Sequence, residues 1–216
     1  MSAVLENLDL FGSGLLTTLS LSVLAALLAF SLGTLLAAFR VSPFPPLVGL
    51  GTTYVELVRN TPLTVLWFFM ALGLPLLNLT LPSFFVAGVL ALGLYTAAFV
   101  CEAVRSGINA VSAGQAEAAR AIGLTFGQSL RLVVLPQALR TVVPPLGNLW
   151  IALVKNSSVG SAFAITEITA VATRLANTNP AEVIAIFIGA AVAYLVLTLS
   201  SGLALGVLER RVVVLR

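Results

Sequence analysis

Residues 60–101 read NTPLTVLWFFMALGLPLLNLTLPSFFVAGVLALGLYTAAFVC and contain no Asp, Glu, Lys or Arg. A helix needs about 20 apolar residues to cross a hydrocarbon core of roughly 30 Å. A run of 42 uncharged residues is therefore long enough for two passes. The middle of the run, PLLNLTLP at residues 75–82, is rich in turn-forming residues. We predict two transmembrane helices, at about 61–77 and 83–104, joined by a short loop.

The composition indicates that most of the surface of the chain faces lipid. Hydrophobic residues make up 59% of the 216 residues and charged residues only 9%, whereas about 25% of the residues in a soluble domain are charged. So few charged side chains cannot cover a water-soluble fold of this size. The mean hydropathy of +1.10 agrees.

The rest of the chain supplies three more candidate spans. An uncharged run of 30 residues predicts a span at about 14–39, and a run of 26 residues predicts one at about 183–208. A further span is expected at about 137–163, broken where two prolines and a lysine interrupt the apolar sequence. The predicted fold is an all-α membrane protein with about five transmembrane helices in a single domain, residues 1–216.

The positions of the basic residues predict the orientation. Cytoplasmic loops carry an excess of Lys and Arg, and an outside N-terminus with a cytoplasmic C-terminus places nine of the eleven cations on the cytoplasmic side or its interface. These nine are Arg40, Arg59, Arg105, Arg120, Arg131, Arg140, Arg210, Arg211 and Arg216. Acidic residues precede the first span, so this span is expected to stay as an anchor rather than to be cleaved.

The composition also excludes several chemistries. The chain has no His, so it has no His metal site and no Ser–His nucleophile pair. Its single cysteine, Cys101, forms neither a disulfide framework nor a thiolate metal cluster. No stretch fits G-x-x-x-x-G-K-[ST], the loop that binds nucleotide phosphates. We therefore expect no catalytic residues, no metal site and no cofactor in this chain, and no enzyme.

The only long polar segment, at about 105–136, carries helix signals. Ser112 and Gln115 match a capping box, and Gly123 stands where a glycine ends a helix in the left-handed conformation. These signals predict a short helix over 113–122. On spacing alone, a solvated loop with two helical turns is an equally good interpretation.

A second short helix is expected directly after the first. Thr125 and Gln128 repeat the capping box. We expect this helix to stop before Pro136, because proline lacks the N–H that a helix interior needs.

The residues of this segment resemble a known family signature. Glu117-Ala118-Ala119, Gly123 and the later pair Leu135-Pro136 match the pattern E-A-A, three residues, G, nine residues, I, one residue, L-P, with Val133 in place of Ile. This pattern is the EAA signature of ABC-importer permease subunits. The resemblance implies the type I ABC importer permease fold and a bacterial plasma membrane location. It assigns coupling to the ATPase subunits to Glu117, Ala118, Ala119, Gly123, Leu135 and Pro136.

Three further stretches resemble permeases for polar amino acids (the histidine, glutamine and glutamate uptake family), most closely the actinobacterial glutamate permeases. They are Glu56 to Leu63, Glu102 to Glu117, and Lys155-Asn156-Ser157-Ser158, where Asn156 stands at a position that is commonly Asp. The candidate substrate-pathway residues are Lys155, Asn156, Ser157, Ser158, Arg59, Thr61 and Glu102. Lys155 has two interpretations: it contacts a substrate carboxylate, or it reaches the outer headgroups with no role in binding. The paired charges near Arg59 and Glu102 are typical of anchoring at the membrane surface, with an inner gate as the alternative.

The resemblance also implies the partners. Energy comes from two separate ATPase subunits that bind ATP-Mg, and an extracytoplasmic binding protein delivers the amino acid. Five spans are too few to enclose a pathway, so we expect a second permease chain, with a heterodimer favoured over a homodimer. The remaining contacts are with membrane lipid, and no nucleic acid is expected. The function indicated is import of polar amino acids, with glutamate as the expected substrate. The alternative is an ion-coupled carrier that works without an ATPase, which the scarcity of carboxylates in the spans disfavours.

Overall fold

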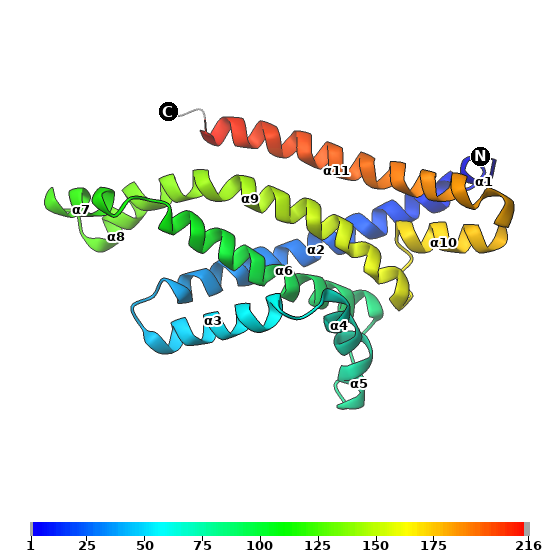
Figure 1. Cartoon of the computed structure of the whole chain (residues 1–216), viewed down its shortest axis with the longest axis horizontal. Coiled ribbons are helices and arrows are strands. Elements are labelled where there is room, and N and C mark those ends of the chain that lie inside the picture. The colour runs from blue at the N-terminus through cyan, green and yellow to red at the C-terminus, as the bar shows by residue number, and fades with distance from the viewer. Residues whose placement is uncertain (1, 214–216) are drawn as a thin grey trace.

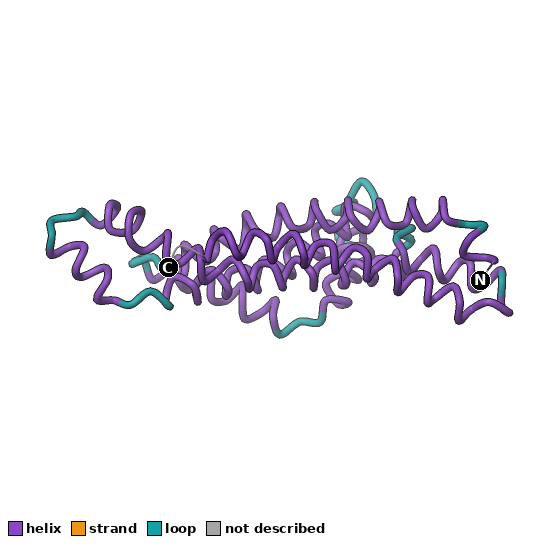
Figure 2. Tube along the Cα trace, turned by 90° about the horizontal axis from the view of Figure 1, so that it is seen from above, coloured by secondary structure: helices purple, strands orange, loops and turns teal. Residues whose placement is uncertain are grey.

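A computed structural model of the chain describes residues 2–213, and these residues form helices joined by turns, with no strand. Figures 1 and 2 show an elongated bundle whose longest helices run along its long axis. The longer α-helices are α2 (Leu8–Arg40), α3 (Pro45–Arg59), α6 (Phe84–Asn109), α7 (Ala113–Ala121), α9 (Leu135–Asn156), α10 (Ile168–Thr178) and α11 (Val183–Val213). The short helices are α1 (Ser2–Leu5), α4 (Leu63–Phe68), α5 (Leu74–Leu76) and α8 (Phe126–Ser129). Two π-helical segments, η1 (Phe69–Gly73) and η2 (Leu130–Val134), and two 3₁₀ segments, η3 (Ser157–Phe163) and η4 (Pro180–Glu182), complete the list.

Three to five of these elements qualify as membrane spans. Within the described residues, α2, α6 and the helical stretch Pro180–Val207 are each long and apolar enough to cross alone. The number rises to five if each of two bent helix pairs counts as one span. An all-helical membrane protein with about five passes, as predicted, agrees with this architecture.

The centre of the bundle is built from small residues that let backbones approach closely. Gly33 of α2 lies so near α6 that an added Cβ would stand 2.6 Å from the Cβ of Val100 and 2.7 Å from the carbonyl oxygen of Ala97. Buried alanines, among them Ala25 and Ala91, line the same contact. Because lipid tails are as apolar as leucine, close packing of small residues is what holds membrane helices together.

The second predicted span, 61–77, is shorter in the structure than a membrane crossing requires. Its helical residues, 63–76, cover only about 21 Å at 1.5 Å per residue, which is short of the bilayer core. The preceding segment forms helix α3, which the sequence analysis did not predict, and α4–α5 turn away from it by 101° and project from the bundle (Figure 1). Pro62 explains the break, since proline disfavours helical backbone in the residue before it.

The predicted stop before Pro136 is wrong. The chain passes from α8 through η2 into α9 without interruption, and Pro136 is the second residue of α9. The wider π-helical turn of η2 lies directly before this proline, and η1 likewise lies directly before Leu74-Pro75. A π-helical turn shifts the hydrogen-bond partners by one residue. The helix can therefore continue past the proline, which has no N–H to donate.

The break expected within 137–163 lies at the end of that range. Helix α9 continues through Pro144 and Pro145 to Asn156 and then tightens into η3. The chain turns only at Ala164, whose φ of 55° is left-handed, and α10 leaves at 47° to the preceding helical run. Prolines inside a transmembrane helix are tolerated where neighbouring groups satisfy the freed backbone.

Candidate coupling segment and substrate pocket

Helices α7 and α8 form a hairpin at one end of the bundle (Figures 1 and 2). Gly123 ends α7 with a φ of +91°. Its N–H donates to the carbonyl of Arg120 at 3.0 Å, and the N–H of Leu124 donates to the carbonyl of Ala119 at 3.2 Å. These two bonds define a Schellman motif, so the prediction that glycine ends this helix is confirmed.

The two predicted capping boxes have different outcomes. At α8 the box is complete, because the Thr125 hydroxyl accepts from the N–H of Gln128 and the Gln128 side chain accepts from the N–H of Thr125. At α7 the prediction is wrong: Ser112 is the N-cap, but its side chain makes no capping bond. The N–H of Gln115 donates to the carbonyl of Ser112 at 3.0 Å instead, so the hydroxyl is not needed.

The residues of the EAA signature divide into an exposed and a buried set. Glu117 and Ala118 are exposed, whereas Ala119 is only 4% exposed because it packs inside this chain. Leu135 is partly exposed and Pro136 is exposed. The small size of Ala119 therefore serves the packing of α7, and that of Ala118 is available to a partner.

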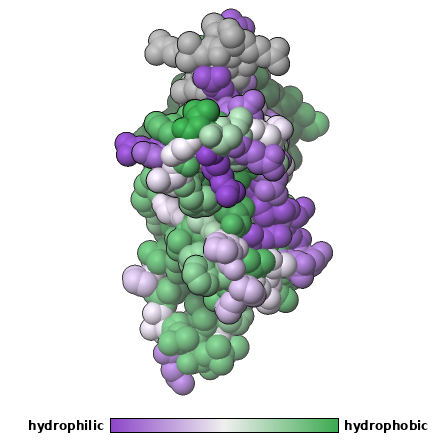
Figure 3. Space-filling model, turned by 90° about the vertical axis from the view of Figure 1, so that its left-hand side faces the viewer, coloured by the Kyte–Doolittle hydropathy of each residue, from purple (hydrophilic) through white to green (hydrophobic). Residues whose placement is uncertain are grey.

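Two apolar side chains flank Gly123 and were not identified from the sequence. Ile122 is 80% exposed and Phe126 is 79% exposed. Figure 3 views this end of the molecule and shows hydrophobic patches among the hydrophilic residues. The sequence did contain a signal for them, because both are large apolar residues within a polar, charged segment. Apolar residues exposed together mark an interaction surface.

A small pocket lies between α6 and α9. Its volume is about 170 Å³. Along α6 it is lined by Tyr95, Thr96 and Phe99, and along α9 by Leu149, Ala152, Leu153 and Asn156. Tyr95 and Phe99 are four residues apart and Leu149, Ala152 and Asn156 are three and four residues apart, so each set lies on one helix face. A phenol, a hydroxyl and an amide beside apolar walls suit a small polar solute.

A cluster of charges adjoins this pocket. Glu102 of α6 binds Arg40 of α2 and lies 3.0 Å from Arg105, one turn along its own helix. Arg59 of α3 is 3.8 Å from the same carboxylate, and its guanidinium lies 5.5 Å from the centroid of the Phe99 ring. The structure thus brings together Arg59, Glu102 and, through Phe99, the pocket that Asn156 lines.

The remaining predicted pathway residues are not among those that line this pocket. Lys155 is exposed and does not line the pocket. The hydroxyl of Ser157 is buried and donates to a backbone carbonyl three residues earlier, and that of Thr61 donates to a carbonyl four residues earlier. Ser158 is half-buried, and its carbonyl accepts from Ser161. The hydroxyls of Ser157 and Thr61 are therefore engaged by backbone carbonyls close to them in the sequence.

The structure also shows a buried carboxylate that the sequence analysis missed. Glu167, fully buried, caps α10 by accepting from the N–H groups of Thr169 and Ala170 at 2.9 and 2.8 Å. It also accepts from the hydroxyl of Tyr194 in α11 at 2.6 Å. An acidic residue directly before a helix is the usual signal for such a cap. Since its acceptors are engaged, Glu167 ties α10 to α11.

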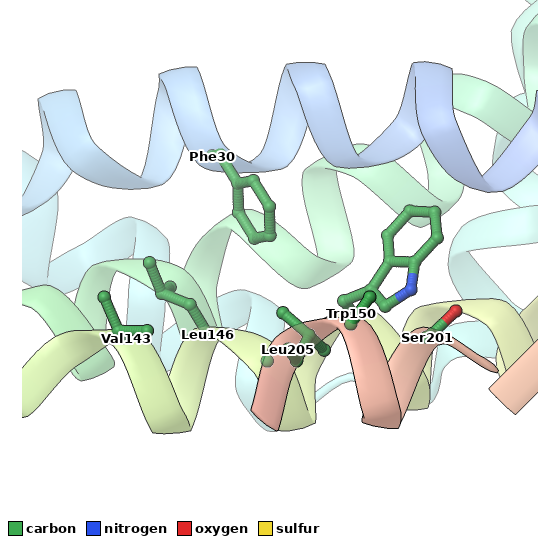
Figure 4. Close-up of a pocket in the computed structure, with 8 residues that line it drawn as sticks. Phe30, Val143, Leu146, Trp150, Ser201 and Leu205 are labelled. Carbon is green, nitrogen blue, oxygen red and sulfur yellow. The ribbon is translucent and has the colours of Figure 1, made fainter. Parts of the chain in front are cut away.

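A second hollow, shown in Figure 4, does not suit a polar solute. Phe30 of α2, Val143, Leu146 and Trp150 of α9, and Leu205 of α11 converge on about 490 Å³ of space. Ser201 is the one hydroxyl among the residues that line it. The pocket between α6 and α9 is therefore the better candidate for a substrate. No cluster of ligands for a metal ion occurs among residues 2–213.

The sequence and the structure both match known transport proteins. The model of the family described as "Binding-protein-dependent transport system inner membrane component" matches residues 29–214. The probable glutamine ABC transporter permease protein GlnM of Bacillus subtilis is 41% identical over 211 residues, covering 98% of this chain and 97% of that protein. The glutamate transport system permease protein GluC of Corynebacterium glutamicum is 40% identical over 208 residues, covering 91% of each.

A solved structure agrees with these relatives. An amino acid ABC transporter crystallised with histidines has a chain that superimposes with a TM-score of 0.89 at 34% identity, covering 96% of both chains. The type I importer permease fold, predicted from the signature at 117–136, is thereby confirmed.

Proposed function

The chain belongs to the family of binding-protein-dependent transport system inner membrane components, and from this premise we propose that it is the permease subunit of an ATP-driven importer of polar amino acids. The observation that carries the proposal is the α7–α8 hairpin. It presents Glu117 and Ala118 on helix α7, which Gly123 ends, while the sequence offers no phosphate-binding loop of its own. The energy therefore comes from separate ATPase subunits that bind ATP-Mg.

The coupling contact is a small, partly apolar surface. Glu117 contributes a charge to this surface and Ala118 a small side chain that allows close approach. Ile122 and Phe126 contribute large apolar groups. Gly123 sets the angle between α7 and the following chain, and Leu135 and Pro136 continue the same segment into α9. When the ATPase pair closes, this hairpin moves and carries α6 and α9 with it as rigid levers.

The pathway for the amino acid includes the pocket between α6 and α9. Asn156 and Thr96 offer hydrogen bonds, and the charged cluster at Glu102 lies beside it. Glutamate is the proposed substrate, supported by the likeness to a glutamate permease at 40% identity. The GlnM likeness makes glutamine the first competitor to test.

The assembly contains further chains. A second permease, with a heterodimer favoured, completes a pathway that one small bundle does not enclose. An extracytoplasmic binding protein delivers the amino acid to the end opposite α7, where α10 exposes Arg174. This orientation, with the N-terminus outside, rests on the nine cations assigned to the cytoplasmic side.

The test is reconstitution of the chain with candidate ATPase, permease and binding-protein partners in liposomes. We expect the ATPase subunits to co-purify with the chain, and uptake of labelled glutamate to require ATP inside the lumen that represents the cytoplasm. Replacing Glu117 with Arg should abolish uptake while leaving the amount of chain in the membrane unchanged. Uptake that continues without ATPase subunits but follows an ion gradient would contradict the proposal and favour the ion-coupled carrier.

A further inference from the structure

Three guanidinium groups converge on one carboxylate beside the pocket. Arg40 comes from α2, Arg59 from α3 and Arg105 from α6, and all three lie within ion-pair distance of Glu102. The four side chains carry a formal charge of +2. A surplus of cations held near the apolar interior of a membrane protein is costly and is usually tied to function.

The three arginines are not held equally. Arg40 is hydrogen-bonded to Glu102 and its side chain is 12% exposed, and Arg105 donates to the other carboxylate oxygen at 3.0 Å. Arg59 stands off at 3.8 Å, beyond hydrogen-bond length, and its side chain is 47% exposed. Glu102 is therefore hydrogen-bonded to two partners, and Arg59, which pairs with it only at 3.8 Å, is the guanidinium that can most readily exchange this carboxylate for another anion.

Arg59 is also the one of the three that touches the wall of the pocket. Its guanidinium lies over Phe99, and Phe99 lines the pocket together with Asn156. Packing against the ring holds the guanidinium plane in place without using its N–H donors. Those donors suit bidentate binding of a carboxylate.

We propose that Arg59 binds the α-carboxylate of the transported amino acid and that Glu102 is the resting counter-ion from which Arg59 is released. This inference rests on the proposed function and adds a substrate contact to it. Every free amino acid carries an α-carboxylate, so this contact selects amino acids as a class. Other residues of the pathway distinguish one amino-acid side chain from another. An amino acid whose α-carboxylate is amidated is excluded.

The experiment measures direct binding of labelled ligand to the purified permease–ATPase complex in nanodiscs, without binding protein. The ligands are glutamate, glutamine and the α-amide of glutamate. We expect the wild type to bind glutamate and glutamine in preference to the α-amide. Arg59→Gln should raise the Kd for glutamate and glutamine about tenfold or more and leave weak α-amide binding unchanged, because only a charge-assisted bond is lost. Arg59→Lys should recover part of the affinity.

Arg210→Gln, at an exposed arginine on the far end of α11, is the control and should bind all three ligands as the wild type does. The proposal is overturned if Arg59→Gln binds glutamate as tightly as the wild type, or if the wild type binds the α-amide as tightly as glutamate. It is also overturned if the wild-type complex drives ATP-dependent uptake yet binds no amino acid directly. That last result leaves the proposed function intact, whereas a complex without ATP-dependent uptake contradicts the proposed function itself.

Discussion

The guanidinium of Arg59 lies 5.5 Å from the centre of the Phe99 ring, although the two residues are 40 positions apart and belong to helices α3 and α6. This contact places a cation from an unforeseen helix at the edge of the pocket that α6 and α9 enclose. The same pocket distinguishes two residues that are neighbours in the sequence. Asn156 lines that pocket, and Lys155 beside it does not.

The first prediction compares these two neighbours. Asn156→Leu removes a hydrogen-bonding amide from the pocket and should raise the half-saturating concentration for glutamate uptake about tenfold. Lys155→Met changes an exposed side chain and should have a smaller effect. The measurement is uptake by the reconstituted importer over a range of glutamate concentrations. A larger rise in the half-saturating concentration for Lys155→Met than for Asn156→Leu would contradict this prediction and would favour Lys155 as a contact of the substrate carboxylate.

A second prediction concerns the end of α7. Gly123 has open space around its Cα but a φ of +91°, so Gly123→Ala tests backbone conformation without a steric clash. The strain of about 1 kcal/mol should shift the hairpin and lower coupled ATPase activity and uptake. Gly127→Ala is the matched control, because Gly127 also has open space and lies within helix α8. Equal activity of the two variants would show that the left-handed turn is not needed for coupling.

The capping boxes give a third prediction. Thr125→Ala removes a side chain that caps α8 and should destabilise the hairpin by about 1 kcal/mol. Ser112→Ala should change little, because the Ser112 hydroxyl makes no capping bond. Hydrogen exchange of the α7–α8 hairpin in nanodiscs measures both. Faster exchange in the Ser112 variant than in the Thr125 variant would contradict the assignment.

A fourth prediction concerns the contact between α2 and α6. Gly33→Ala places a methyl group 2.6 Å from the Cβ of Val100, and the helices must move apart at a cost of about 1–3 kcal/mol. The melting temperature of the detergent-purified chain should fall. Gly12→Ala on the same helix meets no atom within 4 Å and should preserve or raise it. A melting temperature that is unchanged by Gly33→Ala would show that this close approach does not limit stability.

Features that depend on nearby residues were predictable from the sequence. The uncharged runs located three long helices, because a span requires many consecutive apolar side chains. Gly123 and Thr125 marked helix ends correctly, because the hydrogen bonds that they make join residues within five positions. The signature at 117–136 identified the family for the same reason, since its residues lie on one short hairpin and its approach to α9.

Features that depend on packing were decided by the tertiary structure. Helix α3 returns along α2 and α6, so Arg59 comes within 3.8 Å of Glu102, a residue 43 positions away on another helix. Ala118 and Ala119 are the same residue type, and only the packing of α7 buries one and leaves the other exposed. The carboxylate of Glu167 meets Tyr194 across 27 residues. Local signals set helix lengths and ends because backbone hydrogen bonds are short-range, whereas the angles between helices depend on side chains that meet only after folding.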